Sequence, residues 1–138
     1  MWEYEHSVET TAAPEVLWRH WASVAEWPEW NAGIERIEMD GPFAAGTVFT
    51  MTPPGDEPLR MRLTEVVPGE LFTDEMDAGD FVVRTVHSLE AAGAGKTRVV
   101  YRTEISGVAA DQVGPSIGPA ITADFPDVVA ALVRRAEG

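Results

Sequence analysis

The sequence predicts an α+β fold in which a curved antiparallel sheet is covered by a long C-terminal helix. Residues 2–10 alternate between apolar or aromatic and polar side chains, and six further strand-like segments follow between turn signals. Near the end of the chain, apolar residues recur at steps of three and four, which is typical of an amphipathic helix. An open sheet with one apolar face needs a covering layer. A helix of about 20 residues is about 30 Å long, enough to supply that layer.

The N-terminal part is predicted to form one strand and two short helices. The strand-like face predicted to be buried carries Trp2, Tyr4, His6 and Val8. A helix is predicted to begin at Pro14, because proline suits a first turn in which its missing N–H costs nothing. Its buried stripe carries Leu17, Trp18, Trp21 and Val24. A second short helix or turn is predicted around residues 26–31, where Pro28 changes the direction of the chain and Gly33 offers a stop.

Six strands are predicted in the middle of the chain, separated by glycine, proline and aspartate clusters. They cover residues 34–40, 46–53, 58–67, 71–77, 80–90 and 96–106. The short loops favour an antiparallel meander. Arginines oppose apolar residues within these strands and are therefore expected on the solvent face. In segments 46–53 and 71–77 both alternating faces carry apolar residues, so the sequence leaves open which of them faces inward.

The C-terminal helix is predicted from a stripe of Ile117, Ile121, Phe125, Val128 and Leu132. Glycine and proline pairs within residues 114–119 predict loose or kinked first turns. Pro126 lies inside the stripe. It therefore predicts either a kink or a restart of the helix near Asp124.

Composition narrows the class of protein. The chain has 138 residues and is expected to form a single domain over residues 1–138. It carries no cysteine, which excludes disulfides and a catalytic thiol, and its net charge of −13 argues against binding to nucleic acid. No signal peptide and no membrane-spanning stretch is expected, so a cytoplasmic location without membrane insertion is predicted. The expected state is a monomer or a weak homodimer.

Several segments resemble a known family. The stretches Ala13–Trp18 and Trp27–Asn31, Gly46 in the first hairpin, and residues 95–99 before the last strand are similar to polyketide cyclase/dehydrase-type members of the START-like, or birch-pollen-allergen-like, superfamily. The resemblance extends to Ala123–Pro126 and so covers essentially the whole chain. It implies the helix-grip fold: a seven-stranded curved antiparallel sheet around a long C-terminal helix, with a cavity between them. Members bind lipids, hormones, flavonoids or polyketides, and a subset cyclises polyketide chains.

The implied cavity directs attention to inward-facing side chains. In this fold the first strand pairs with the last, so a small polar cluster is expected from Tyr4, His6, Thr85, His87, Tyr101 and Thr103. Apolar lining is expected from Phe49, Met51, Met61, Phe72, Ile121 and Phe125, and Trp30 is the tryptophan expected to touch a ligand, whereas Trp18 and Trp21 are expected to be mostly core. Most clusters of acidic residues are expected in solvated turns. Asp124 is the exception to examine, because it lies beside the buried stripe of the C-terminal helix.

Two functions remain open. The first is binding of a hydrophobic, aromatic or polyketide-like small molecule between sheet and helix. The second is an aromatase/cyclase-type enzyme in which His6, His87 or Tyr101 acts as acid or base during aldol closure and dehydration. Polyketide enzymes of the superfamily also use inward arginines, and here the arginines are predicted to face outward. The three histidines lack metal-ligand spacing, and no phosphate-binding glycine loop is present, so no metal or cofactor is expected.

Overall fold

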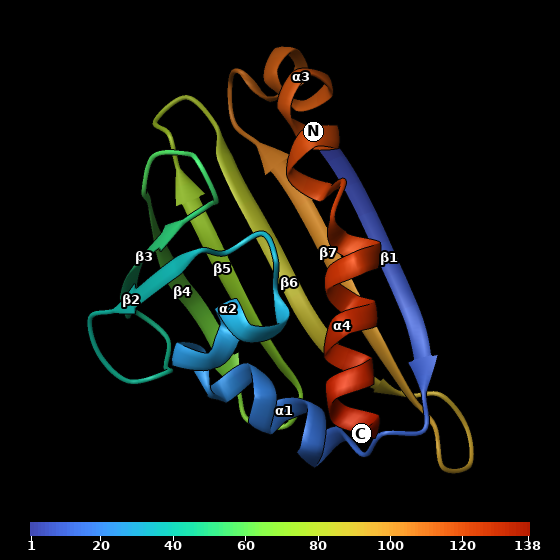
Figure 1. Cartoon of the computed structure of the whole chain (residues 1–138). Coiled ribbons are helices and arrows are strands. Elements are labelled where there is room, and N and C mark those ends of the chain that lie inside the picture. Colours follow the sequence, from blue (N-terminus) through green and yellow to red (C-terminus); the bar gives the residue numbers. More distant parts are fainter.

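The structure, a computed structural model, describes residues 1–138 and contains one seven-stranded sheet with helices on one of its faces (Figure 1). The spatial strand order is β1-β7-β6-β5-β4-β3-β2, and every neighbouring pair is antiparallel. The strands are β1 (Trp2–Thr10), β2 (Arg36–Met39), β3 (Val48–Thr52), β4 (Leu59–Val67), β5 (Leu71–Asp77), β6 (Val82–Ala91) and β7 (Thr97–Ser106). The helix-grip fold is thereby confirmed, with strand bounds within a few residues of those predicted.

The helices lie on the concave side of this sheet. They are α1 (Pro14–Ala22), the short 3-10 helix η1 (Val24–Glu26), α2 (Trp27–Trp30), α3 (Ala110–Thr122) and α4 (Phe125–Glu137). Pro14 occupies the first turn of α1 and Pro28 that of α2, as the sequence predicts. In Figure 1, α3 and α4 run alongside β1 and β7, while α1 and α2 cover the lower part of the sheet.

The C-terminal helical segment begins earlier than predicted and is divided in two. The break falls at Ala123 and Asp124, and α4 restarts with Pro126 in its first turn. Of the two outcomes that Pro126 predicts, a kink or a restart near Asp124, the structure therefore shows the restart. Proline at this position lacks the N–H that a continuous helix would need. The break lets α3 and α4 follow different parts of the curved sheet.

The segment from α3 to α4 corrects one expectation. By length and composition alone, Ala110–Glu137 would be long and apolar enough to cross a membrane, whereas the sequence analysis expected no such stretch. In this fold its apolar residues face the sheet, and Val128, Val129 and Leu132 of α4 are buried in the core. Packing against the sheet therefore accounts for the apolar composition of this segment.

The core is formed by two separate clusters. The larger one joins the tryptophans of α1 and α2 to the middle of the sheet and to α4. The smaller one contains Val83, Ile105 and Ala110 and lies where α3 meets the sheet. The strand arginines face outward, where Arg102 pairs with Glu3 at 2.9 Å and Arg98 with Glu9 at 3.1 Å. The predicted solvent face of the arginines is thus observed.

Candidate functional site

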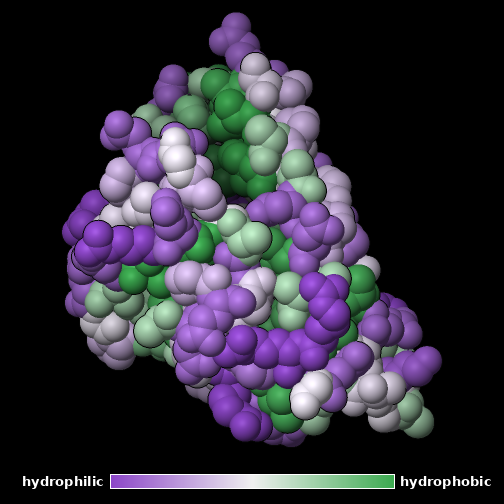
Figure 2. Space-filling view, viewed as in Figure 1, coloured by the Kyte–Doolittle hydropathy of each residue, from purple (hydrophilic) through white to green (hydrophobic).

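A cavity of about 710 Å³ lies between the sheet, α2 and the helical segment α3–α4. Its walls take residues from both core clusters, so it occupies the space between them. Most of the lining is apolar or aromatic. Figure 2 shows a hollow lined by hydrophobic surface between α3 and the sheet, where the cavity meets solvent. The charged side chains in the lining are all carboxylates, namely Asp56, Asp74 and Asp124.

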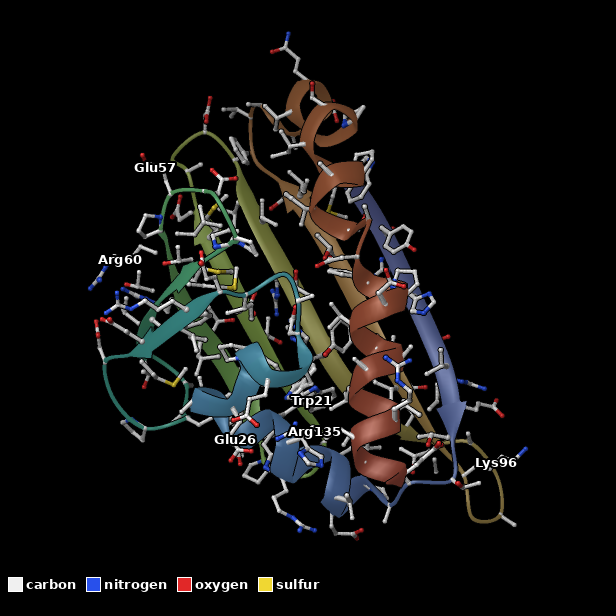
Figure 3. All side chains as sticks on the ribbon, in the orientation of Figure 1. Trp21, Glu26, Glu57, Arg60, Lys96 and Arg135 are labelled. Atoms are coloured by element: carbon white, nitrogen blue, oxygen red, sulfur yellow. The ribbon has the colours of Figure 1, made fainter.

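An aromatic cluster forms one end of the cavity. His87 of β6 stacks on Phe72 of β5, with ring centroids 4.0 Å apart and planes 5° from parallel. Tyr101 of β7 meets His87 edge-on at 4.6 Å. Trp21 of α1, labelled in Figure 3, closes this end, with its ring centroid 5.2 Å from that of Phe72 and 6.2 Å from that of Tyr101. Rings from three strands and one helix therefore fix one another's orientation.

The phenol of Tyr101 is held by a single hydrogen bond. Trp21 Nε1–H donates to Tyr101 Oη at 3.2 Å, which uses the oxygen as an acceptor and leaves the O–H proton free to donate. Burial raises the pKa of Tyr101, so the phenol stays protonated. Because Tyr101 lines the cavity, it can offer this proton to a bound group.

The imidazole of His87 presents an acceptor. Its Nδ1 lies 3.2 Å from the carbonyl oxygen of Phe72, and since a carbonyl only accepts, Nδ1 carries the proton in this contact. Burial lowers the pKa of His87 to about 3, which keeps the ring neutral. Nε2 is therefore left with a lone pair and no hydrogen-bond donor.

Asp74 is the residue that sequence reasoning missed. It lies in β5 opposite Thr85 and is only 8% exposed, with no hydrogen-bond partner and no cation. Its Oδ2 lies 4.0 Å from Nε2 of His87. Burial, with a smaller contribution from Glu75, raises the pKa of Asp74 to about 7. The expectation that the acids of this region lie in solvated turns is therefore wrong for Asp74.

The inward position of Asp74 depends on the strand pairing around it. Asp74 pairs with Leu63 of β4, and Thr73 pairs with Glu65, so a bulge at Thr64 shifts the register within β4. Across β6 the pairing is regular, which places Phe72, Asp74 and Met76 on the same face as His87, Thr85 and Val83. This pairing decides the question that the sequence left open for segment 71–77. Phe49 and Met51 likewise face inward from β3.

Asp124 lies where α3 meets α4 and borders the cavity beside Gly33. Burial raises its pKa. A Cβ added to Gly33 would lie 2.5 Å from Asp124 Oδ2, so a larger residue here would require the carboxylate of Asp124 to move. No group of three or more histidine, cysteine or acidic side chains is arranged to hold a metal ion.

The structure places most of the predicted site residues around the cavity. Those that line it are Trp30, Phe49, Met51, Met61, Phe72, Thr85, His87, Tyr101, Ile121 and Phe125. Trp21, expected to be mostly core, is fully buried and also borders the cavity. Trp18 is half-buried and packs edge-on against Trp21.

Three predicted residues lie outside the lining: Tyr4, His6 and Thr103. Their strand pairing is as predicted, with Tyr4 opposite Thr103 and His6 opposite Tyr101. Strand β1 is the edge strand under the C-terminal helices, so Tyr4 packs against Phe125 of α4, 6.1 Å between ring centroids. Nε2 of His6 is buried without a partner. Thr103 is fully buried, and its hydroxyl bonds to that of Thr85 at 2.8 Å.

Comparisons with known proteins agree with this architecture. Among solved structures, norcoclaurine synthase from Thalictrum flavum has a TM-score of 0.74 at 18% identity over 96% of this chain and 84% of that chain. The protein Ara h 8.0201 has a TM-score of 0.77 at 14% identity over 97% and 96%. The di-domain ARO/CYC protein BexL from the BE-7585A biosynthetic pathway has a TM-score of 0.76 at 19% identity over 99% and 47%.

At these identities the structural comparisons establish the fold alone, which is the helix-grip fold described above. No curated protein sequence matches this chain. The family model described as polyketide cyclase / dehydrase and lipid transport matches residues 1–137. Since that match spans nearly the full length, the chain belongs to the polyketide cyclase / dehydrase and lipid transport family.

Proposed function

We propose that this protein binds a hydrophobic, aromatic or polyketide-like small molecule in the cavity between the sheet and the C-terminal helices. The observation that carries the proposal is the cavity of about 710 Å³ with a mostly apolar and aromatic wall. Small-molecule sites are typically concave, apolar and about 300–1,000 Å³ in volume, with a few polar groups that orient the ligand. Here Asp74, His87 and Tyr101 are those groups.

The lining also suits a planar, mostly apolar ligand. Met51, Met61 and Met76 contribute flexible thioether side chains, which adapt to irregular ligand shapes. Trp27 and Phe72 of the lining stack on each other, with ring centroids 5.7 Å apart and planes 29° from each other. Aromatic side chains in a cavity wall favour offset or edge-to-face packing against an aromatic ligand.

The proposal is tested by titration with Nile red, a neutral dye whose fluorescence rises in apolar surroundings. We expect saturable binding to the natural protein, and competition by unlabelled aromatic compounds. Met61→Trp on the sheet wall and Ile121→Trp on the helix wall should each reduce binding at least tenfold, because the larger ring fills the cavity. Val108→Trp is the matched control, since Val108 is 94% exposed and outside the lining.

Thermal unfolding of each variant shows whether it still folds. Undiminished dye binding by folded Met61→Trp and Ile121→Trp would place the dye elsewhere and contradict the proposal. Failure of the natural protein to bind the dye or any member of a broad aromatic panel would contradict it as well.

A second candidate function is an aromatase/cyclase-type enzyme. The observation that favours it is that several titratable groups border one end of an open cavity: Asp74, His87 and Tyr101. Neutral Nε2 of His87 could take a proton from a carbon between two carbonyls. The resulting enolate carbon would attack a second carbonyl carbon, and the oxygen there would take the proton of Tyr101 or of protonated Asp74. Loss of water would complete the step.

This candidate is tested with a poly-β-keto substrate analogue, by following its cyclised products. Catalysis predicts that the protein speeds formation of one product and that His87→Gln combined with Tyr101→Phe abolishes this effect while Nile red still binds. The control pair is His6→Gln with Tyr4→Phe, because both residues lie outside the lining. Equal product profiles with and without the natural protein would exclude this activity on that analogue.

A further inference from the structure

We propose that the ligand of this cavity is a hydrophobic amine, whose protonated nitrogen lies between the carboxylate of Asp74 and Nε2 of His87. The inference rests on the proposed binding function and specifies the chemical class of ligand. It is carried by two unpartnered acceptors buried side by side, by the distribution of charge around the cavity and by the aromatic wall beside them.

The two acceptors form a site for a hydrogen-bond donor. Asp74 is 8% exposed and His87 9% exposed, and both line the cavity. Neither Oδ2 of Asp74 nor Nε2 of His87 has a hydrogen-bond partner, and the two atoms lie 4.0 Å apart. A nitrogen about 2.9 Å from each atom satisfies this separation. A primary ammonium group carries three N–H donors, so it can donate to both acceptors at once.

The charges around the cavity favour a cation. Asp56, Asp74 and Asp124 are the charged residues of its lining, and neither lysine nor arginine lines it. Arg84 of the neighbouring strand β6 points to the outer face and pairs with Glu75 at 4.0 Å. A buried carboxylate without a cation is costly to ionise, and a ligand ammonium would supply the missing charge. An anionic ligand would meet only repulsion.

The aromatic wall adds to this preference. Phe72, Tyr101 and Trp21 surround the imidazole of His87 at ring-centroid distances of 4.0, 4.6 and 6.2 Å. These rings shield the site from water, and a lower local dielectric strengthens the attraction between the Asp74 carboxylate and an ammonium group. The apolar remainder of the ligand would occupy the larger space lined by the methionines.

Binding of such an amine would depend on pH through Asp74. Without ligand its pKa is about 7, so the carboxyl must release a proton to pair with an ammonium below that pH. The other ionisable groups around it are His87 on β6, Tyr101 on β7, Glu75 on the outer face of β5, and Asp56 and Asp124 in the lining. His87 and Tyr101 stay neutral between pH 5 and 8, given the pKa of about 3 for His87 and the raised pKa of Tyr101.

The test compares three ligands that share one apolar part. These are 2-(2-naphthyl)ethylamine, 2-(2-naphthyl)ethanol and 2-naphthylacetate, each titrated calorimetrically into the natural protein. At pH 8 we expect the amine to bind at least tenfold more tightly than the alcohol, and the carboxylate to bind more weakly than both. Between pH 7 and pH 5 the dissociation constant of the amine should rise about tenfold per pH unit, and that of the alcohol should stay constant.

Asp74→Asn should abolish the preference for the amine and the pH dependence of amine binding. Asp77→Asn is the matched control, since Asp77 ends the same strand and is exposed; it should keep the preference. If the alcohol binds as tightly as the amine, or if Asp74→Asn retains the preference, the inference is wrong. Nile red distinguishes failure of the amine inference from failure of the proposed binding function. If the natural protein binds the dye but does not prefer the amine, only the amine inference is wrong. If it binds neither the dye nor any of the three ligands, the proposed function is wrong.

Discussion

Trp21 Nε1 donates a hydrogen bond to Tyr101 Oη at 3.2 Å, which joins helix α1 to strand β7 across 80 residues of sequence. Both side chains are buried, at 0% and 4% exposure. The bond closes one end of the cavity and fixes the direction of the phenol. The two residues therefore link the stability of the fold to the geometry of the site.

Tyr101→Phe should destabilise the protein by about 1–3 kcal/mol, because it leaves the indole N–H of Trp21 buried without an acceptor. Urea denaturation measures the change in the free energy of unfolding. Tyr4→Phe is the matched control, since the Tyr4 hydroxyl takes part in none of the side-chain hydrogen bonds of this fold and the residue is only half-buried. Equal stability of the two variants would show that the Trp21–Tyr101 bond contributes nothing.

Asp74 and His87 should have opposite effects on the pH dependence of stability. Folded Asp74 holds its proton up to about pH 7 against 3.8 for the ordinary carboxyl, so its contribution to stability falls as the pH rises from about 4 to 7. Unfolded His87 is protonated below 6.5 but the folded residue only near 3, so its contribution rises with pH from about 3 to 6.5. Each slope is about 1.4 kcal/mol per pH unit, and together they nearly cancel.

Single variants should reveal how Asp74 and His87 each change the free energy of unfolding with pH. Relative to the natural protein, Asp74→Asn should gain stability with rising pH between about 4 and 6.5, because the His87 contribution is then unopposed. His87→Gln should lose stability with rising pH over the same range. Urea midpoints measured at half-unit pH steps provide the comparison. Parallel profiles for the natural protein and both variants would contradict the buried, unpaired state of these groups.

Helix α3 should depend on its two glycines. A Cβ added to Gly118 would lie 2.6 Å from Cε2 of Trp2, and one added to Gly114 would also meet Trp2. Gly118→Ala should therefore cost about 1–3 kcal/mol through overpacking, although alanine is intrinsically the better helix former. Gln112→Ala, on the exposed side of α3, should change stability by less than about 0.5 kcal/mol.

Removing the indole should relieve the clash. In a Trp2→Ala background, Gly118→Ala should cost nothing further, because the space occupied by the ring is then free. Thermal unfolding of the four combinations gives the coupling between the two positions. An undiminished cost in the Trp2→Ala background would mean that the glycine is required for another reason.

Much of the sheet could be predicted because strand alternation has a period of two. The pairing of His6 with Tyr101 and of Tyr101 with His87 follows from inward phases that the sequence displays clearly. Pro126 within an apolar stripe likewise predicts either a kink or a restart of the C-terminal helix, and the restart is observed. These features depend on residues that are close together in the sequence, so a sequence pattern can predict them.

Which side chains line the cavity depends on contacts between segments that are far apart in the sequence. Asp74 faces inward because it pairs with Thr85 in the regular register of β5 against β6, whereas the sequence alone shows residues that could be buried on both faces of its segment. Tyr4 and His6 are excluded because α3 and α4 cover the edge strand. A sequence signal for this existed in the spacing of Gly114 and Gly118, which allows the close approach of α3 to Trp2.

The central claim, that this cavity holds a small hydrophobic molecule, is tested most directly by native mass spectrometry of protein purified from its own source. The account predicts an additional small-molecule mass on the natural protein and on Val108→Trp, which dissociates on denaturation and is missing from folded Met61→Trp. Absence of any such mass from the natural protein, or its retention by Met61→Trp, would contradict the claim.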